Sequence, residues 1–124
     1  MQVELSYGRG TLPVALPPQA KITVIRKPAM PVLPDPAGAV EAALAAPVGS
    51  DRLQAIARGK SSACILICDI TRPVPNGLLL PPLVRTLLAA GIPADRIVVL
   101  VATGLHRPNL GAELDELVGD RWVR

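Results

Sequence analysis

The chain has 124 residues, of which 50% are hydrophobic, 19% charged and 2% aromatic; this is about the length of one domain and too apolar for a disordered chain. Its 13 basic and 10 acidic residues leave a net charge of +3, without the basic stripe and stacking aromatic residues that nucleic-acid binding requires. No apolar stretch approaches the roughly 20 residues that span a bilayer, and the first residues lack the pattern of a secretory signal, so we expect a cytoplasmic protein without a nucleic-acid or membrane partner.

The first sixty residues are rich in proline and predict short elements. Residues 3–7 alternate between apolar and polar, and a Gly-Arg-Gly turn signal separates them from residues 11–16. We expect these two segments to pair as a β-hairpin, although Pro13 restricts the second one to an edge strand or an extended segment. The segment KITVIR at 21–26 is rich in β-branched residues and predicts a further strand.

Two helices are expected before residue 60. Asp35 followed by Pro36 has the pattern of an N-cap with proline at the first helical position, and the alanine-rich segment after it favours a helix to Ala46. Ser50 is placed to cap a short second helix over residues 51–58, which Gly59 would end.

The second half of the chain predicts a strand, a helix and a second strand. Residues 63–68 (ACILIC) and 97–102 (IVVLVA) are continuous apolar runs of strand length, which are typical of parallel strands covered on both faces. Between them, residues 77–90 carry leucines at helical spacing, with Pro81 and Pro82 expected in the first turn. This order indicates an α/β fold with a right-handed, Rossmann-like βαβ core, preceded by the proline-rich part with its hairpin.

Three smaller expectations complete the pattern. Cys64 and Cys68 fall on one face of the first apolar strand, where we expect small buried side chains rather than a disulfide. A last helix is predicted from Asn109 or Gly111 through Val118, and Trp122 with the following valine is expected to begin another strand.

Polar side chains follow both apolar strands directly. In an open parallel sheet the carboxyl ends of the strands meet at one edge, which is where ligands bind. An arginine at this edge can bind a carboxylate or phosphate in a bidentate manner. A neutral imidazole can accept a proton near neutral pH. The candidate site residues are Asp69, Thr71 and Arg72 after the first strand and Thr103, Gly104, His106 and Arg107 after the second.

No metal site is expected on this chain, because it has a single histidine and no CxxC or HExxH spacing. No glycine-rich phosphate-binding motif is present either. Each polar loop alone is a weak signal, since an Asp and an Arg after a strand commonly form a local ion pair. Their placement at one edge of one βαβ unit is what favours a site.

The two loops resemble the signature segments of the nickel-dependent lactate racemase family. The resemblance lies in Cys68-Asp69-Ile70-Thr71-Arg72-Pro73-Val74-Pro75 and in Ala102-Thr103-Gly104-Leu105-His106-Arg107-Pro108. The opening Tyr7-Gly8-Arg9-Gly10 is similar to the start of that family, and so is the segment Leu78 to Leu83. The similarity covers essentially the whole chain.

The resemblance implies that residues 1–124 form one domain, the N-terminal α/β domain of a two-domain racemase or epimerase of 2-hydroxy acids. It implies a nickel pincer nucleotide as cofactor, with hydride transfer at the substrate α-carbon and proton transfer at its hydroxyl. By the motif match, His106 is one of two acid/base histidines, and Asp69 and Arg72 line the cofactor and substrate site. Thr71, Thr103, Gly104 and Arg107 are further contacts.

The same resemblance places the cofactor-anchoring lysine, the nickel-binding histidine and the second acid/base histidine in a part of the family sequence beyond these residues. It therefore implies that this chain alone neither holds the cofactor nor racemises a substrate. The rival hypothesis is a non-catalytic anion-binding or oligomerisation module that self-associates through an open strand edge. A stand-alone hydrolase using His106 as base is a third reading, but no nucleophile presents itself.

Overall fold

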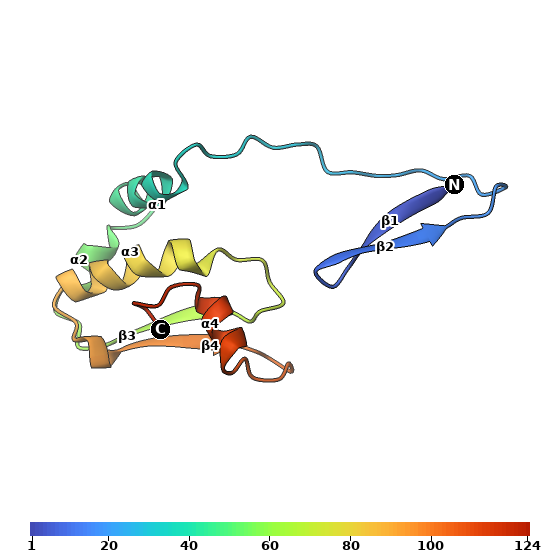
Figure 1. Cartoon of the computed structure of the whole chain (residues 1–124). Helices are drawn as coiled ribbons and strands as arrows, with labels where there is room; N and C mark the ends of the chain where they lie inside the picture. The colour runs from blue at the N-terminus through green and yellow to red at the C-terminus, as the bar shows by residue number, and fades with distance from the viewer. The chain divides into compact units, whose positions relative to one another are not determined.

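The computed structural model describes residues 1–124, and the chain divides into two compact units, Met1–Val32 and Leu33–Arg124 (Figure 1). Each unit is described by itself. No helix in the structure has the length and apolar character needed to cross a membrane.

The first unit is built on the predicted hairpin. Strands β1 (Gln2–Tyr7) and β2 (Gly10–Ala15) pair antiparallel, with Leu5 opposite Leu12 and Pro13 opposite Glu4. Gly8, at a φ of 56°, makes the tight reversal that a side chain would oppose. The strand predicted over residues 21–26 is wrong, because that segment has no partner strand and β-branched composition alone does not form a ladder.

The second unit begins with two helices that pack on a third. Helix α1 (Pro36–Ala45) starts as predicted, with the Asp35 carboxylate accepting a hydrogen bond of 2.9 Å from the Gly38 N–H. Helix α2 (Leu53–Ala57) is shorter than predicted and has no side-chain cap, since the Ser50 hydroxyl donates to the Asp51 carbonyl instead. Both helices contact α3 (Asn76–Ala89) (Figure 1).

The βαβ core is confirmed. Strands β3 (Ala63–Cys68) and β4 (Ile97–Ala102) have the predicted bounds and pair parallel, with Cys68 opposite Ala102 at their carboxyl ends. Helix α3 connects them through a 3₁₀ turn at Ala94–Arg96, and α4 (Ala112–Val118) follows β4. The core beneath the strands joins Ile67 of β3 and the fully buried Leu80 of α3 to the apolar side of α4.

Within residues 1–124 only one face of this sheet is covered, whereas the sequence predicted two covered faces. Helices α3 and α4 both pack on the face that carries Ile65, Ile67 and their neighbours on β4. The opposite face has no covering element. Its side chains are exposed: Cys64, Leu66, Cys68, Val98, Leu100 and Ala102. The two cysteines do share a face, but it is the bare one.

Two further expectations are corrected. Helix α3 begins at Asn76, so Pro81 and Pro82 lie in its second turn, where they are buried against the core. Trp122 begins no strand. The Asp120 carboxylate accepts hydrogen bonds from the N–H groups of Trp122 and Val123, at 2.9 and 3.1 Å, and holds this segment in a turn.

Candidate functional site

The two polar loops meet at the carboxyl edge of the sheet. Because β3 and β4 end side by side, Asp69 and Thr103 leave the sheet as neighbours. A cavity of about 390 Å³ opens between the loops. Five of the seven predicted site residues line it, together with Cys68, Ala102 and Leu105: Asp69, Arg72, Thr103, Gly104 and His106.

Asp69 and His106 form a direct pair at the centre of this edge. The imidazole Nδ1 of His106 contacts Oδ2 of Asp69. The carboxylate side chain is 6% exposed, whereas the imidazole is 54% exposed. A carboxylate on Nδ1 favours the tautomer that carries its proton there and leaves Nε2 free to accept a proton. A backbone bond of 3.0 Å from the His106 N–H to the Thr103 carbonyl holds the turn that presents the ring.

The Asp69 carboxylate is held in its ionised form by its neighbours. Its Oδ1 accepts hydrogen bonds from the Thr71 hydroxyl at 2.6 Å and the Thr71 N–H at 3.2 Å. The Thr71 hydroxyl first, and His106 second, lower the pKa of Asp69 below its ordinary value, against the opposing effect of burial. Thr71 therefore contacts the site through Asp69 and does not line the cavity.

The two arginines of the site have different surroundings. Arg72 lines the cavity and is exposed, and no carboxylate of the chain pairs with its guanidinium. Arg107 instead binds Glu113 with both its terminal nitrogens, at 2.7 and 2.8 Å. This pair raises the pKa of Arg107 and lowers that of Glu113. The structure therefore does not bring Arg107 into the cavity with His106.

Three residues at this edge were missed by the sequence reasoning. Asn76 and Asn109 are buried and hydrogen-bonded, and Glu113 holds Arg107. The signal available for the last two was their spacing, because Asn109 and Glu113 stand four residues apart at the start of a predicted helix, where side chains meet.

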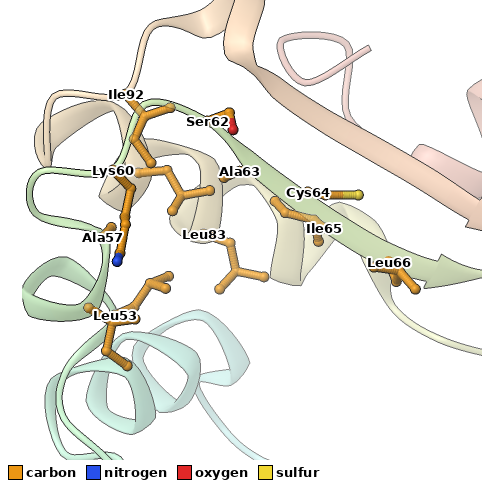
Figure 2. Close-up of a pocket in the computed structure, with 12 residues that line it drawn as sticks. Leu53, Ala57, Lys60, Ser62, Ala63, Cys64, Ile65, Leu66, Leu83 and Ile92 are labelled. Carbon is orange, nitrogen blue, oxygen red and sulfur yellow. The ribbon is translucent and has the colours of Figure 1, made fainter.

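A larger cavity of about 470 Å³ lies beside β3, between α2 and α3 (Figure 2). Figure 2 shows that apolar side chains such as Leu53, Leu83 and Ile92 surround it. Lys60 is the only basic residue that lines this cavity, and no carboxylate or imidazole lines it. It lacks the groups for proton transfer, so we place the candidate site at the smaller cavity.

The residues at the edge suit an anion rather than a bare metal ion. No cluster of three or more histidine, cysteine, aspartate or glutamate side chains is arranged to hold a metal. Arg72 offers a cation to a phosphate or carboxylate, and Gly104, whose φ is 58°, leaves open space in the loop after β4 where a ligand can come close to the backbone. These residues fit the anionic part of a nucleotide or of a small organic acid.

A parallel βαβ unit with a carboxylate–imidazole pair and an unpaired arginine at its carboxyl edge defines an α/β domain with side chains suited to binding an anion and transferring a proton. Comparison with known proteins identifies the family to which this domain belongs. The family model of the lactate racemase N-terminal domain matches residues 7–124, and the chain belongs to this family.

Two curated relatives are lactate racemases. The one from Lactiplantibacillus plantarum is 46% identical over 84 residues, which cover 68% of this chain and 20% of the relative. The one from Thermoanaerobacterium thermosaccharolyticum is 34% identical over 123 residues, which cover 98% of this chain and 29% of the relative. The solved structure of the latter's apoprotein matches with a TM-score of 0.70 and 30% identity, over 99% of this chain and 28% of that one. The chain thus spans less than a third of the length of these relatives.

Proposed function

We propose that residues 1–124 act as the N-terminal domain of a 2-hydroxyacid racemase or epimerase, with His106 as an acid/base residue. The observation that carries the proposal is the Asp69–His106 pair, which faces a cavity shared with the unpaired Arg72. Membership of the lactate racemase N-terminal domain family supports the choice of reaction.

The chemistry assigned to this chain is proton transfer at the substrate hydroxyl. The Nε2 atom of His106 accepts the hydroxyl proton as that oxygen becomes a carbonyl, and returns it when the alcohol is re-formed. Asp69 is the positioning residue that fixes the tautomer and stabilises the imidazolium. Arg72 holds the substrate carboxylate or the cofactor phosphate.

The proposed cofactor is the nickel pincer nucleotide, which would supply a hydride acceptor and donor for the substrate α-carbon. On this chain Arg72 and the backbone around Thr103 and Gly104 are the groups suited to its anionic part. Since these residues offer no nickel ligand set, we assign the metal-binding side chains and the second acid/base histidine to a further domain. We expect that domain to be required for activity.

The bare face of the β3–β4 sheet supports the presence of such a further domain, because parallel sheets are covered on both faces in complete α/β proteins. We propose a small 2-hydroxy acid as substrate and a cytoplasmic location. Lactate is the substrate that the names of the relatives suggest.

The test is a chimera in which this chain replaces the matching segment of the Thermoanaerobacterium thermosaccharolyticum lactate racemase, loaded with cofactor. We expect the chimera to interconvert the enantiomers of lactate, and His106→Ala to reduce kcat by about 10²- to 10⁴-fold. Arg96→Ala, at the opposite end of β4, is the matched control. A chimera that folds, holds cofactor and keeps full activity with His106→Ala would contradict the proposal.

A further inference from the structure

The buried polar side chains of the whole chain gather at one place. They are Asp69, Asn76 and Asn109, which are 5%, 4% and 7% exposed. Asp69 is the first residue after β3, Asn76 is the first residue of α3, and Asn109 lies between β4 and α4. A buried amide is costly unless its hydrogen bonds are made, so the partners of the two asparagines indicate what these residues do.

Asn109 joins the two loops of the site. Its Oδ1 accepts from the N–H of Ile70, the residue after Asp69, at 3.4 Å, and its Nδ2 donates to Oε2 of Glu113 at 2.9 Å. The same Glu113 binds Arg107, the residue after His106. A continuous series of hydrogen bonds therefore runs from the neighbour of the carboxylate to the neighbour of the imidazole.

Asn76 fastens the other end of the first loop. Its Nδ2 donates to the Leu117 carbonyl in the last turn of α4 at 3.0 Å. Beside it, the backbones of Gly77 and Gly119 are so close that a Cβ on Gly77 would lie 2.6 Å from the Gly119 carbonyl oxygen. The segment from Asp69 to Asn76 is thus held at both ends against the α4 region.

We propose that Asn109 is a positioning residue of this site, which through Ile70 and Glu113 keeps the Asp69 carboxylate on Nδ1 of His106. The inference rests on the proposed function only for the role of the Asp69–His106 pair in proton transfer. The contact between the two side chains is a property of this chain. Asn109 contributes no atom to the cavity, and its effect passes through Asp69. Asn76 is the second anchor of the same loop.

An amide, rather than a carboxylate, is needed at position 109. Ile70 presents a donor, while Glu113 presents an acceptor, and of these two groups the amide satisfies both whereas an ionised carboxylate satisfies only the donor. Asn109→Asp keeps the shape and the acceptor for Ile70 but opposes the Glu113 carboxylate with a second negative charge. The double variant Asn109→Asp, Glu113→Gln restores a donor–acceptor pair with its polarity reversed.

The test uses the single histidine of this chain, whose imidazole nitrogens give one unambiguous set of ¹⁵N resonances. In the unmodified chain we expect Nδ1 to carry the proton and Nε2 to be bare when the ring is neutral. In Asn109→Asp we expect a mixture of tautomers and an Ile70 amide that exchanges with solvent about five-fold faster or more. The double variant should regain the single tautomer.

Ile92→Val is the control for a purely structural loss, because it removes a methyl group from a buried side chain that packs with Ala57 and Leu87, away from the site. It should lower stability while leaving the tautomer unchanged. If Asn109→Asp folds and keeps both the tautomer and the Ile70 exchange rate, the inference is overturned. If it does not fold, the double variant decides: recovery of both readouts supports the inference, whereas mixed tautomers in a folded double variant, with a single tautomer in Glu113→Gln alone, contradict it.

These readouts need no substrate, cofactor or turnover. An inactive chimera would count against the proposed reaction and leave the tautomer result standing. An active chimera whose His106 tautomer ignores Asn109→Asp would refute the positioning role alone.

Discussion

The loops after β3 and β4 both contain an Arg-Pro dipeptide, but the two arginines have different surroundings. Arg72-Pro73 follows β3 and Arg107-Pro108 follows β4. Arg72 reaches the cavity without a carboxylate partner, while Arg107 is bound at both nitrogens by Glu113. The first loop leaves its cation available for a ligand, and the second uses its cation to hold the loop in shape.

The difference shows that an arginine's role at a sheet edge depends on the carboxylates within its reach. Asp69, the acid nearest in sequence to Arg72, is committed to Thr71 and His106. Arg107 has Glu113 six residues ahead, at the start of α4. The first loop thus contributes a buried acid and a free cation, and the second an exposed imidazole and its support.

The largest effect is expected on catalysis, from a substitution that removes the Asp69–His106 contact between the two loops. Asp69→Asn leaves a donor where His106 Nδ1 needs an acceptor, so the ring loses its favoured tautomer. We expect kcat of the chimera to fall by about 10²- to 10⁴-fold with little change in KM. Steady-state kinetics measures this, with Asp95→Asn in the 3₁₀ turn as a matched control. A kcat within about two-fold of the unmodified chimera would remove Asp69 from the mechanism.

The next effect separates the two arginines. Arg72→Ala should weaken binding of lactate or inorganic phosphate by about 10- to 100-fold, because a charged hydrogen-bonding group is lost from the cavity. Arg107→Ala should weaken it much less, since its guanidinium already binds Glu113. Calorimetric titration of the two variants and of Arg96→Ala compares them. Equal losses for both arginines would show that the second loop also supplies a ligand contact.

A smaller effect is expected on stability when Gly77 or Gly104, one glycine near each loop, is replaced by alanine. Gly77→Ala forces a Cβ to 2.6 Å from the Gly119 backbone and should cost about 1–3 kcal/mol through overpacking. Gly104 has open space around it and only a positive φ of 58° to maintain, so Gly104→Ala should cost about 1 kcal/mol. Urea unfolding of both variants gives the order, and a reversed order would show that the close approach of α3 and α4 yields easily.

The smallest effect concerns pH. Because the pKa of Asp69 is lowered on folding, its contribution to stability is fully present above the unfolded value of about 3.9 and is lost as pH falls through the folded value. The stability difference between the unmodified chain and Asp69→Asn should therefore shrink in acid, as the carboxylate becomes protonated. Unfolding curves between about pH 5 and pH 2 test this; a difference that grows as pH falls through this range would mean that the carboxylate is not stabilised in its charged form.

The βαβ unit was predictable because ACILIC and IVVLVA are apolar throughout their length, and both strands have the predicted bounds. The number of faces of the sheet that are covered could not be predicted, because composition does not tell how many layers pack on a strand. The meeting of Asp69 with Arg72 and His106 followed from parallel topology alone. The partner of Arg107 did not, because it depends on where α4 begins.

The asparagines illustrate the same limit. Asn76 and Asn109 read as ordinary loop residues, and only the packing of α4 against the loops makes them buried contacts. Residues 21–26 show the converse, since strong β-branched composition produced no strand without a neighbour to pair with.

The pairing of Asp69 with His106 is tested most directly by the ¹⁵N spectrum of His106 in the unmodified chain beside that of Asp69→Asn, at a pH where the ring is neutral. We predict that the unmodified chain holds one tautomer, with the proton on Nδ1 and Nε2 bare, and that Asp69→Asn does not. An imidazole with its proton mainly on Nε2 in the unmodified chain, or identical spectra for the two proteins, would contradict it.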